Sequence, residues 1–175
     1  MPQLIDRSGA KADRFAVVRN GAVLADLPPG PVIVPLALWL AARDGLLARG
    51  DVGVWLAPAD DPAQIAADVA LLPVIAVDFP AFADGRGYSS GRLLRERFGY
   101  RGELRAIGDI QRDQLHYLWQ VGFDAFALLD DRDVQDALKA FHESSDGYQL
   151  TQQRTPWFRR RAAAAPKVQQ ESVGP

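Results

Sequence analysis

From residue 52 onward, short apolar runs alternate with helix-forming segments about every 20 to 30 residues, and this rhythm constrains the fold more than any other feature. The runs lie at residues 52–56, 73–77, 103–107 and 124–129. An earlier run at 32–34, followed by a helix expected from 36 to about 48, adds a fifth unit. Alternating strands and helices are typical of a parallel sheet with right-handed crossovers.

Four to five strand–helix units predict an α/β fold with a parallel sheet. A complete eight-unit barrel needs about 250 residues, whereas this chain has 175. We therefore expect half of a TIM-like barrel or an open sheet, formed as a single domain over residues 1–150. Two β-prone runs, 15–18 and 22–24, flank Asn20-Gly21. Because Asn-Gly is typical of tight hairpin turns, an N-terminal β-hairpin is predicted there.

Residues 151–175 are expected to form a C-terminal tail that is partly disordered. The tail places Trp157 and Phe158 directly before three arginines, Arg159 to Arg161. Such a segment would either pack back onto the domain or bind a partner.

Composition excludes several classes of function. The formal net charge is −2 and cysteine is absent, which excludes nucleic-acid binding by bulk charge, disulfides, thiolate nucleophiles and cysteine-ligated iron–sulfur clusters. Two histidines leave little room for a zinc site, and no metal site is predicted. The sequence leaves any cofactor unknown. The longest apolar run, 31–42, falls short of the roughly 20 residues that span a membrane. Without a leader segment, a cytoplasmic protein with no membrane partner is expected.

Carboxylates follow the predicted strands at the edge where parallel α/β sheets bind their ligands. Asp78 comes directly after the strand at 73–77, Asp84 lies in the following loop, and Asp109 follows the next strand. As functional groups these three would act as general acids or bases, and a ring of such carboxylates would also suit Mg²⁺. In the structural alternative, Asp78 bonds the amides of its own loop and Asp109 caps a helix.

The connection after strand 73–77 is longer than the usual 2 to about 6 residues and rich in glycine. Its glycines would permit a tight turn and close approach of a ligand. Ser89 or Ser90 would begin the next helix, whose free amide groups favour an anion. A small anion, a phosphate-bearing ligand and a purely structural turn are the alternatives. The loop glycines singled out at this edge are Gly85, Gly87 and Gly108.

Of the 20 basic residues, 17 are arginine, whose planar guanidinium binds oxyanions in bidentate fashion. Arg105 falls inside a predicted strand, so it should point into a ligand-lined face or toward a carboxylate such as Asp78 or Asp109. Arg92 is also spaced for an ordinary helical ion pair with Glu96. The anion-binding candidates are Arg86, Ser89, Ser90, Arg92, Arg105 and Arg112.

These motifs also carry a family resemblance. The chain resembles the bacterial domain of unknown function 934, whose members look like small proteins encoded beside assimilatory sulfite reductase. The resemblance covers about residues 15 to 145 and leaves out the tail. The residues that carry it are Asp78-Phe79-Pro80, Asp84-Gly85-Arg86-Gly87-Tyr88-Ser89-Ser90, Arg92-Leu93-Leu94-Arg95, Gly102-Glu103-Leu104-Arg105-Ala106, Gly108-Asp109 and Arg112-Asp113-Gln114.

The resemblance implies a role in sulfur metabolism, and three hypotheses follow. In the first, the protein is an accessory of sulfate and sulfite reduction that binds an oxyanion, a phosphate-bearing ligand, or the reductase or its electron donor through residues 78–92. In the second, it is a small half-barrel enzyme, such as an oxidoreductase, with an aspartate acid/base and an arginine anion clamp. In the third, it is a scaffold whose half barrel is completed by dimerisation.

Overall fold

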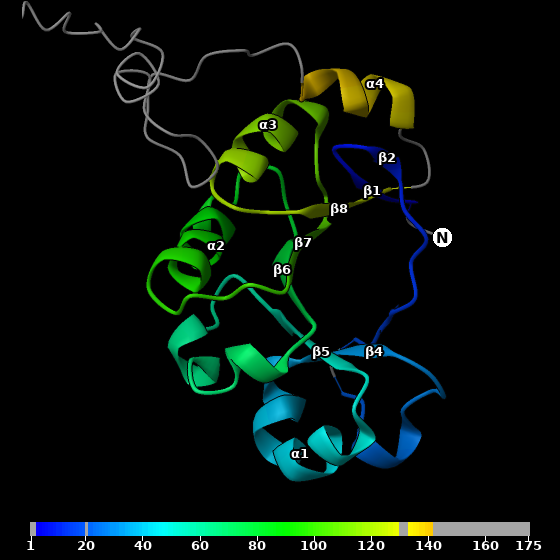
Figure 1. Cartoon of the computed structure of the whole chain (residues 1–175), viewed down its shortest axis with the longest axis vertical. Helices are drawn as coiled ribbons and strands as arrows, with labels where there is room; N and C mark the ends of the chain where they lie inside the picture. The colour runs from blue at the N-terminus through cyan, green and yellow to red at the C-terminus, as the bar shows by residue number, and fades with distance from the viewer. Residues whose placement is uncertain (1–2, 20, 130–132, 142–175) are drawn as a thin grey trace, which may run out of the picture.

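A computed structural model describes residues 3–19, 21–129 and 133–141 of the chain. Eight strands form one curled sheet in the order β2-β1-β8-β7-β6-β5-β4-β3, so the architecture is an α/β half barrel (Figure 1). The strands are β1 (Gln3–Asp6), β2 (Gly9–Ala10), β3 (Ala16–Val17), β4 (Val32–Pro35), β5 (Val52–Leu56), β6 (Val74–Phe79), β7 (Glu103–Gly108) and β8 (Ala125–Leu128).

The sheet is mixed, whereas a parallel sheet was predicted. The six strands from β3 to β8 are parallel to one another, but β1 pairs antiparallel with both β8 and β2. Because β1 enters from the N-terminus without a crossover helix, it can add to the β8 edge in the antiparallel direction.

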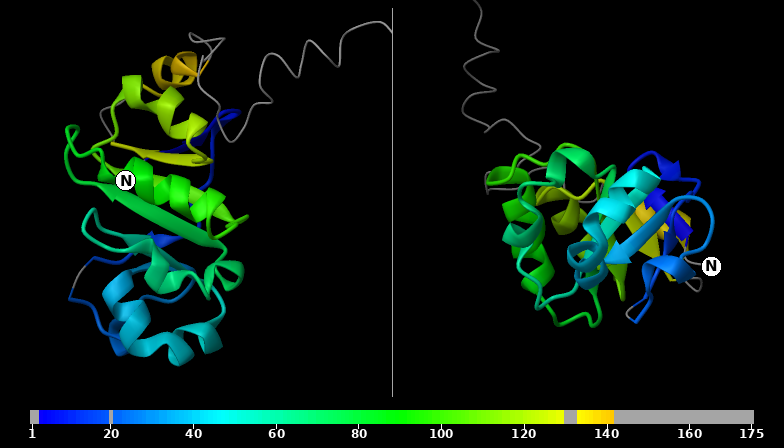
Figure 2. Two further views of the ribbon diagram at one scale, coloured as in Figure 1. Left: turned by 90° about the vertical axis from the view of Figure 1, so that its left-hand side faces the viewer. Right: turned by 90° about the horizontal axis from the view of Figure 1, so that it is seen from below.

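The helices lie along the outer side of the curl (Figures 1 and 2). They are α1 (Leu36–Arg49), α2 (Arg86–Glu96), α3 (Arg112–Gln120) and α4 (Val134–Ala140), with the short 3₁₀ turns η1 (Leu24–Asp26), η2 (Pro62–Ile65) and η3 (Val69–Leu71). The strands predicted from apolar runs are confirmed, as is the helix after β4. The prediction of a helix after β5 is wrong, because this segment forms two 3₁₀ turns. Asp61 caps the first of these turns.

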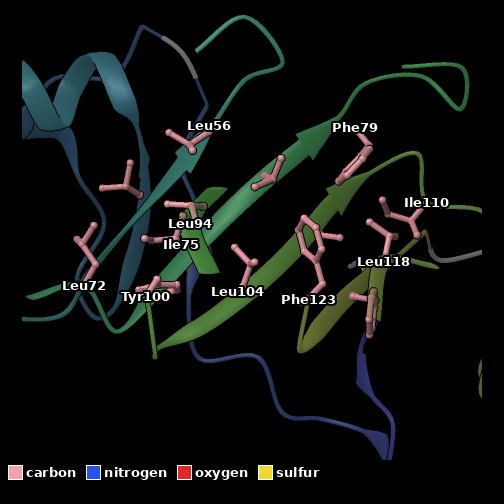
Figure 3. Packing of buried hydrophobic residues seen from close by; sticks show 14 of the residues in the cluster. Leu56, Leu72, Ile75, Phe79, Leu94, Tyr100, Leu104, Ile110, Leu118 and Phe123 are labelled. Carbon is pink, nitrogen blue, oxygen red and sulfur yellow. The ribbon is translucent and has the colours of Figure 1, made fainter. Parts of the chain in front are cut away.

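Alternation along the strands separates two apolar layers. Ile75, Phe79 and Leu104 face the helices, where they pack with Leu94 and Leu118 in the main core (Figure 3). The alternate positions, on the inner side of the curl, form a smaller cluster. Its buried members are Phe15, Ile33, Trp55, Val74, Ala76 and Ile107.

The inner face of the half barrel is covered by residues 11–18, called here the N-terminal strap. The strap crosses from the β1–β2 end of the sheet to the β4 end (Figure 1). Phe15 packs into the inner cluster, and the indole Nε1 of Trp55 donates a hydrogen bond to the Val18 carbonyl at 2.8 Å. The strap therefore buries apolar surface that an open half barrel would expose.

The hairpin predicted around Asn20-Gly21 is wrong. Val17 pairs in parallel with Ile33 of β4, and residues 22–23 form no strand. An N-terminal hairpin does exist, but earlier, between β1 and β2. Asn-Gly favours a turn only locally, and Gly21 does lie in a turn with a φ of +91°. The parallel pairing of β3 with β4 means that this turn does not close a hairpin.

Candidate functional site

The carboxyl ends of the parallel strands meet at one edge, called here the carboxyl edge. The loop after β6 spans only residues 80–85, because α2 already begins at Arg86. Ser89 and Ser90 therefore lie inside the first turns of α2. The prediction that one of them begins the helix is wrong. Gly85 is the N-cap and makes no side-chain capping bond. Ser89 is exposed and Ser90 is buried.

Arg86 is held by a carboxylate two residues away. Its Nε and Nη2 donate to the two carboxylate oxygens of Asp84 at 2.9 and 2.7 Å, and its backbone amide also donates to Asp84 at 3.2 Å. These hydrogen bonds lower the pKa of Asp84. The pair closes the loop locally, so the two predicted functional groups engage each other.

The glycines of this segment serve packing. A Cβ atom on Gly87 would lie 2.5 Å from Cζ of Phe79, and one on Gly91 would lie 2.4 Å from Cε2 of Phe123. Their absence of a side chain lets α2 approach the sheet closely. Gly85 has no such contact; its added Cβ would meet only Tyr88, at 3.9 Å. Gly87 and Gly91 therefore have a structural role in the packing of α2 against the sheet.

Asp78 is a carboxylate whose surroundings raise its pKa. It lies at the carboxyl end of β6, and its side chain is 15% exposed. Burial raises its pKa, an effect opposed by the charge of Arg19, whose Nη1 lies 3.9 Å from Oδ1 of Asp78. Gly108, with a φ of +101°, makes room beside it, since a Cβ there would lie 2.9 Å from the same oxygen.

The alternative prediction that Asp109 caps a helix is wrong. The N-cap of α3 is Gln111, which forms a reciprocal capping box with Gln114. Asp109 instead accepts a hydrogen bond from Nε2 of Gln111 at 2.7 Å. Gln114 also donates to the carbonyl oxygen of Phe82 at 3.3 Å, which ties the loop after β6 to α3. Over the described ranges, no cluster of three or more His, Asp or Glu side chains is arranged to hold a metal ion.

The remaining predicted anion-binding arginines are dispersed, and each is bonded to a carboxylate. Arg92 forms the helical pair with Glu96 at 2.9 Å that its spacing predicts. Arg105 points to the strap and to Glu103, and its predicted alternatives Asp78 and Asp109 are not its partners. Arg112 bonds Asp136 at 2.9 Å, beside a cavity of about 450 Å³ between α3 and α4.

Two residues at the carboxyl edge were missed by sequence reasoning. Arg19 follows β3, which was predicted as part of a hairpin. Phe82 is a large apolar side chain, 51% exposed in the loop after β6. A large aromatic residue in a strand–helix loop is a signal that could have identified it. The predicted tail, the boundary at residue 150, and Trp157 and Phe158 lie outside the described residues.

The family model described as "bacterial protein of unknown function (DUF934)" matches residues 53–158, more than half of the chain. The chain belongs to this family. The match begins later than the expected residue 15. It also reaches beyond residue 145 and includes Trp157 and Phe158, which the expected range left out. No curated protein sequence matches the chain. Within the described part, none of the helices combines the length and apolarity needed to cross a membrane.

Proposed function

We propose that this DUF934 protein is an accessory of assimilatory sulfite reduction that docks on the reductase or its electron donor through the loop after β6. The observation that carries the docking surface is Phe82. Its ring is half exposed, while its carbonyl is bonded to Gln114 and the adjacent turn is closed by Asp84 and Arg86. A large apolar side chain on a braced loop is typical of interface hot spots, because little entropy is lost on binding.

The metabolic context of the proposal comes from the family resemblance to proteins encoded beside the reductase. The geometry favours docking of a protein over capture of an oxyanion by the predicted clamp. Arg86, Arg92 and Arg112 each already bond a carboxylate. Removing such a guanidinium from its partner costs part of the energy that anion binding would gain.

Growth and co-purification test the proposal together. A strain lacking the gene should fail on sulfate and on sulfite and grow on sulfide. The tagged full-length chain should co-purify the reductase or its donor at mild salt, and Phe82→Ala should abolish this. Leu40→Ala is the matched control, because Leu40 is similarly exposed, at 49%, on α1. Normal growth on all sources, or equal capture by both variants, would overturn the proposal.

A second candidate function, catalysis, is favoured by Asp78. A partly buried carboxyl group with a raised pKa at the carboxyl end of a central strand is a typical general acid or base. Catalysis and docking are separable. Asp78→Asn should abolish complementation and preserve co-purification if Asp78 is an acid/base, whereas Phe82→Ala should lose both if docking is the function.

The dimeric scaffold is the least favoured alternative. Closure of a barrel from two copies needs an open inner face, but the strap covers it, and Trp55 and Ile107 are buried there. Light scattering tests this alternative: a mass of 19.1 kDa corresponds to the monomer.

A further inference from the structure

Arg19 and Asp78 form an ion pair across the opening of the half barrel at the carboxyl edge, called here the mouth. Arg19 follows β3, and Asp78 belongs to β6, three positions away in the sheet order. Neighbouring strands are spaced about 4.8 Å apart, so in a flat sheet these strands would be separated by about 14 Å. The curl of the sheet and the long arginine side chain bring Nη1 to 3.9 Å from Oδ1 of Asp78. The pair therefore lies across the carboxyl edge.

The backbone beside Arg19 is held while its side chain stays accessible. The Val18 amide donates to the Ile33 carbonyl at 2.9 Å, and the Val18 carbonyl accepts from Trp55. The Arg19 side chain is 66% exposed. At 3.9 Å its contact with Asp78 is an ion pair beyond hydrogen-bond length, in contrast to the hydrogen-bonded pairs of Arg86 and Arg112.

Asp78 is suited to release this arginine. Among the described residues, Arg19 is the charged group that acts on it, and no hydrogen bond to its carboxylate is found there. Burial raises its pKa and so weakens its hold on the negative charge. The carboxylate is thus a weak competitor for the guanidinium.

We propose that Arg19 binds a small oxyanion at the mouth of the half barrel and that this anion displaces Asp78 as the partner of the guanidinium. The ligand chemistry is that of sulfite, sulfate, phosphate or a carboxylate, any of which can accept two parallel hydrogen bonds from one arginine. This site goes beyond the docking function, because it uses neither Phe82 nor the loop after β6. The anion-binding role thereby moves from Arg86 and Arg92 to Arg19.

Amide chemical shifts of the ¹⁵N-labelled full chain test the proposal site by site. Sodium sulfite, sulfate, phosphate and formate are titrated separately at constant ionic strength, which distinguishes sulfur oxyanions from phosphate and carboxylate. We expect saturable shifts at the amides of Val18, Phe79 and Gly108. Shifts that are absent for all four anions, or that concentrate at α2, would overturn the proposal.

Three variants sharpen the result. Arg19→Gln should abolish saturation, and Arg92→Gln, which removes an exposed guanidinium of α2, should leave it unchanged. Asp78→Asn should tighten binding by about five- to tenfold, because a competing charge at about 4 Å is removed. Saturation retained in Arg19→Gln, or weaker binding in Asp78→Asn, would overturn it. The spectrum of each variant also reports whether it is folded. If Arg19→Gln loses anion binding but still co-purifies the reductase or its donor, the anion site and the docking function are independent of each other.

Discussion

Nη1 of Arg105 lies 2.9 Å from both carboxylate oxygens of Asp13, although the two residues are 92 positions apart. Arg105 is 2% exposed on the inner face of the sheet, where its Nη2 also lies 2.8 Å from Glu103. A buried guanidinium needs such partners, because leaving it unpaired is costly. The strap therefore supplies both the charge that Arg105 needs and Phe15, which covers the apolar face.

Removing the strap carboxylate should destabilise the protein. Asp13→Ala leaves Arg105 with one carboxylate and weakens the attachment of the strap. We expect a loss of about 1–3 kcal/mol in the free energy of unfolding, less than for a completely unpaired buried charge. Urea unfolding followed by circular dichroism measures it. Asp26→Ala is the control, since Asp26 is an exposed acid of η1. Equal stability of the two variants would contradict the role of the strap.

The same network should make stability depend on pH. Burial by itself would raise the pKa of Glu103, but its hydrogen bond to Lys11 and its interactions with Lys11 and Arg105 outweigh this and lower the pKa below its ordinary value of 4.5. A lowered carboxyl pKa contributes stability that is present above pH 4.5 and lost as pH falls through the folded-state pKa. Urea midpoints between pH 7 and 3 should fall more steeply for the wild type than for Glu103→Gln. Parallel curves would contradict this.

Because α2 contacts the sheet closely at Gly87, adding a side chain there should lower the stability of the protein. Gly87→Ala places a methyl group 2.5 Å from the ring of Phe79, which is buried and cannot move freely. Overpacking of this kind costs about 1–3 kcal/mol, measurable as a fall in melting temperature. Gly85→Ala is the matched control, because its methyl group meets nothing closer than 3.9 Å. If both variants melt alike, the packing role of Gly87 is wrong.

The central strands were predictable because their signal is local. Residues 74–77 and Val52–Leu56 are apolar runs that are buried on both faces, as expected for parallel strands under helices. The helix starts were less accessible. Gln111 is not a favoured N-cap residue, and Gly85 is a weaker one by type than the nearby Ser89. Asp109 is likewise a better N-cap residue by type than Gln111, so only the tertiary structure decides between them.

The site was harder to predict, because the availability of an arginine depends on its partner. The partner of Arg92 is four residues away, and periodicity predicts it. Arg105 has one partner nearby, Glu103, but its other partner Asp13 lies 92 residues away. The partner of Arg112 lies 24 residues away. The sequence has no periodic signal at either of these longer separations. Arg19 was missed for a related reason: its contact with Asp78 depends on the curl of the sheet.

Replacing Asp78 should stabilise the protein at neutral pH. Burial raises the pKa of this carboxyl group above its ordinary value of 3.8. The unfolded chain therefore releases the proton more readily, and stability falls as pH rises from 3.8 through the folded-state pKa. Asp78→Asn removes this penalty and keeps the shape of the side chain. We expect a higher melting temperature than the wild type at pH 7, and equal melting temperatures below pH 3.8.

Asp84→Asn provides the opposite case, because hydrogen bonds from Arg86 lower the pKa of Asp84. Its substitution should leave stability unchanged or reduce it at pH 7. If Asp78→Asn raises the melting temperature at pH 7 and Asp84→Asn does not, then Asp78 lowers the stability of the wild type. Such a cost in stability is common for functional groups. If Asp78→Asn instead lowers the melting temperature at pH 7, the attraction of Arg19 outweighs burial. Asp78 would then be a structural partner of Arg19, and the arginine would not be available to an anion.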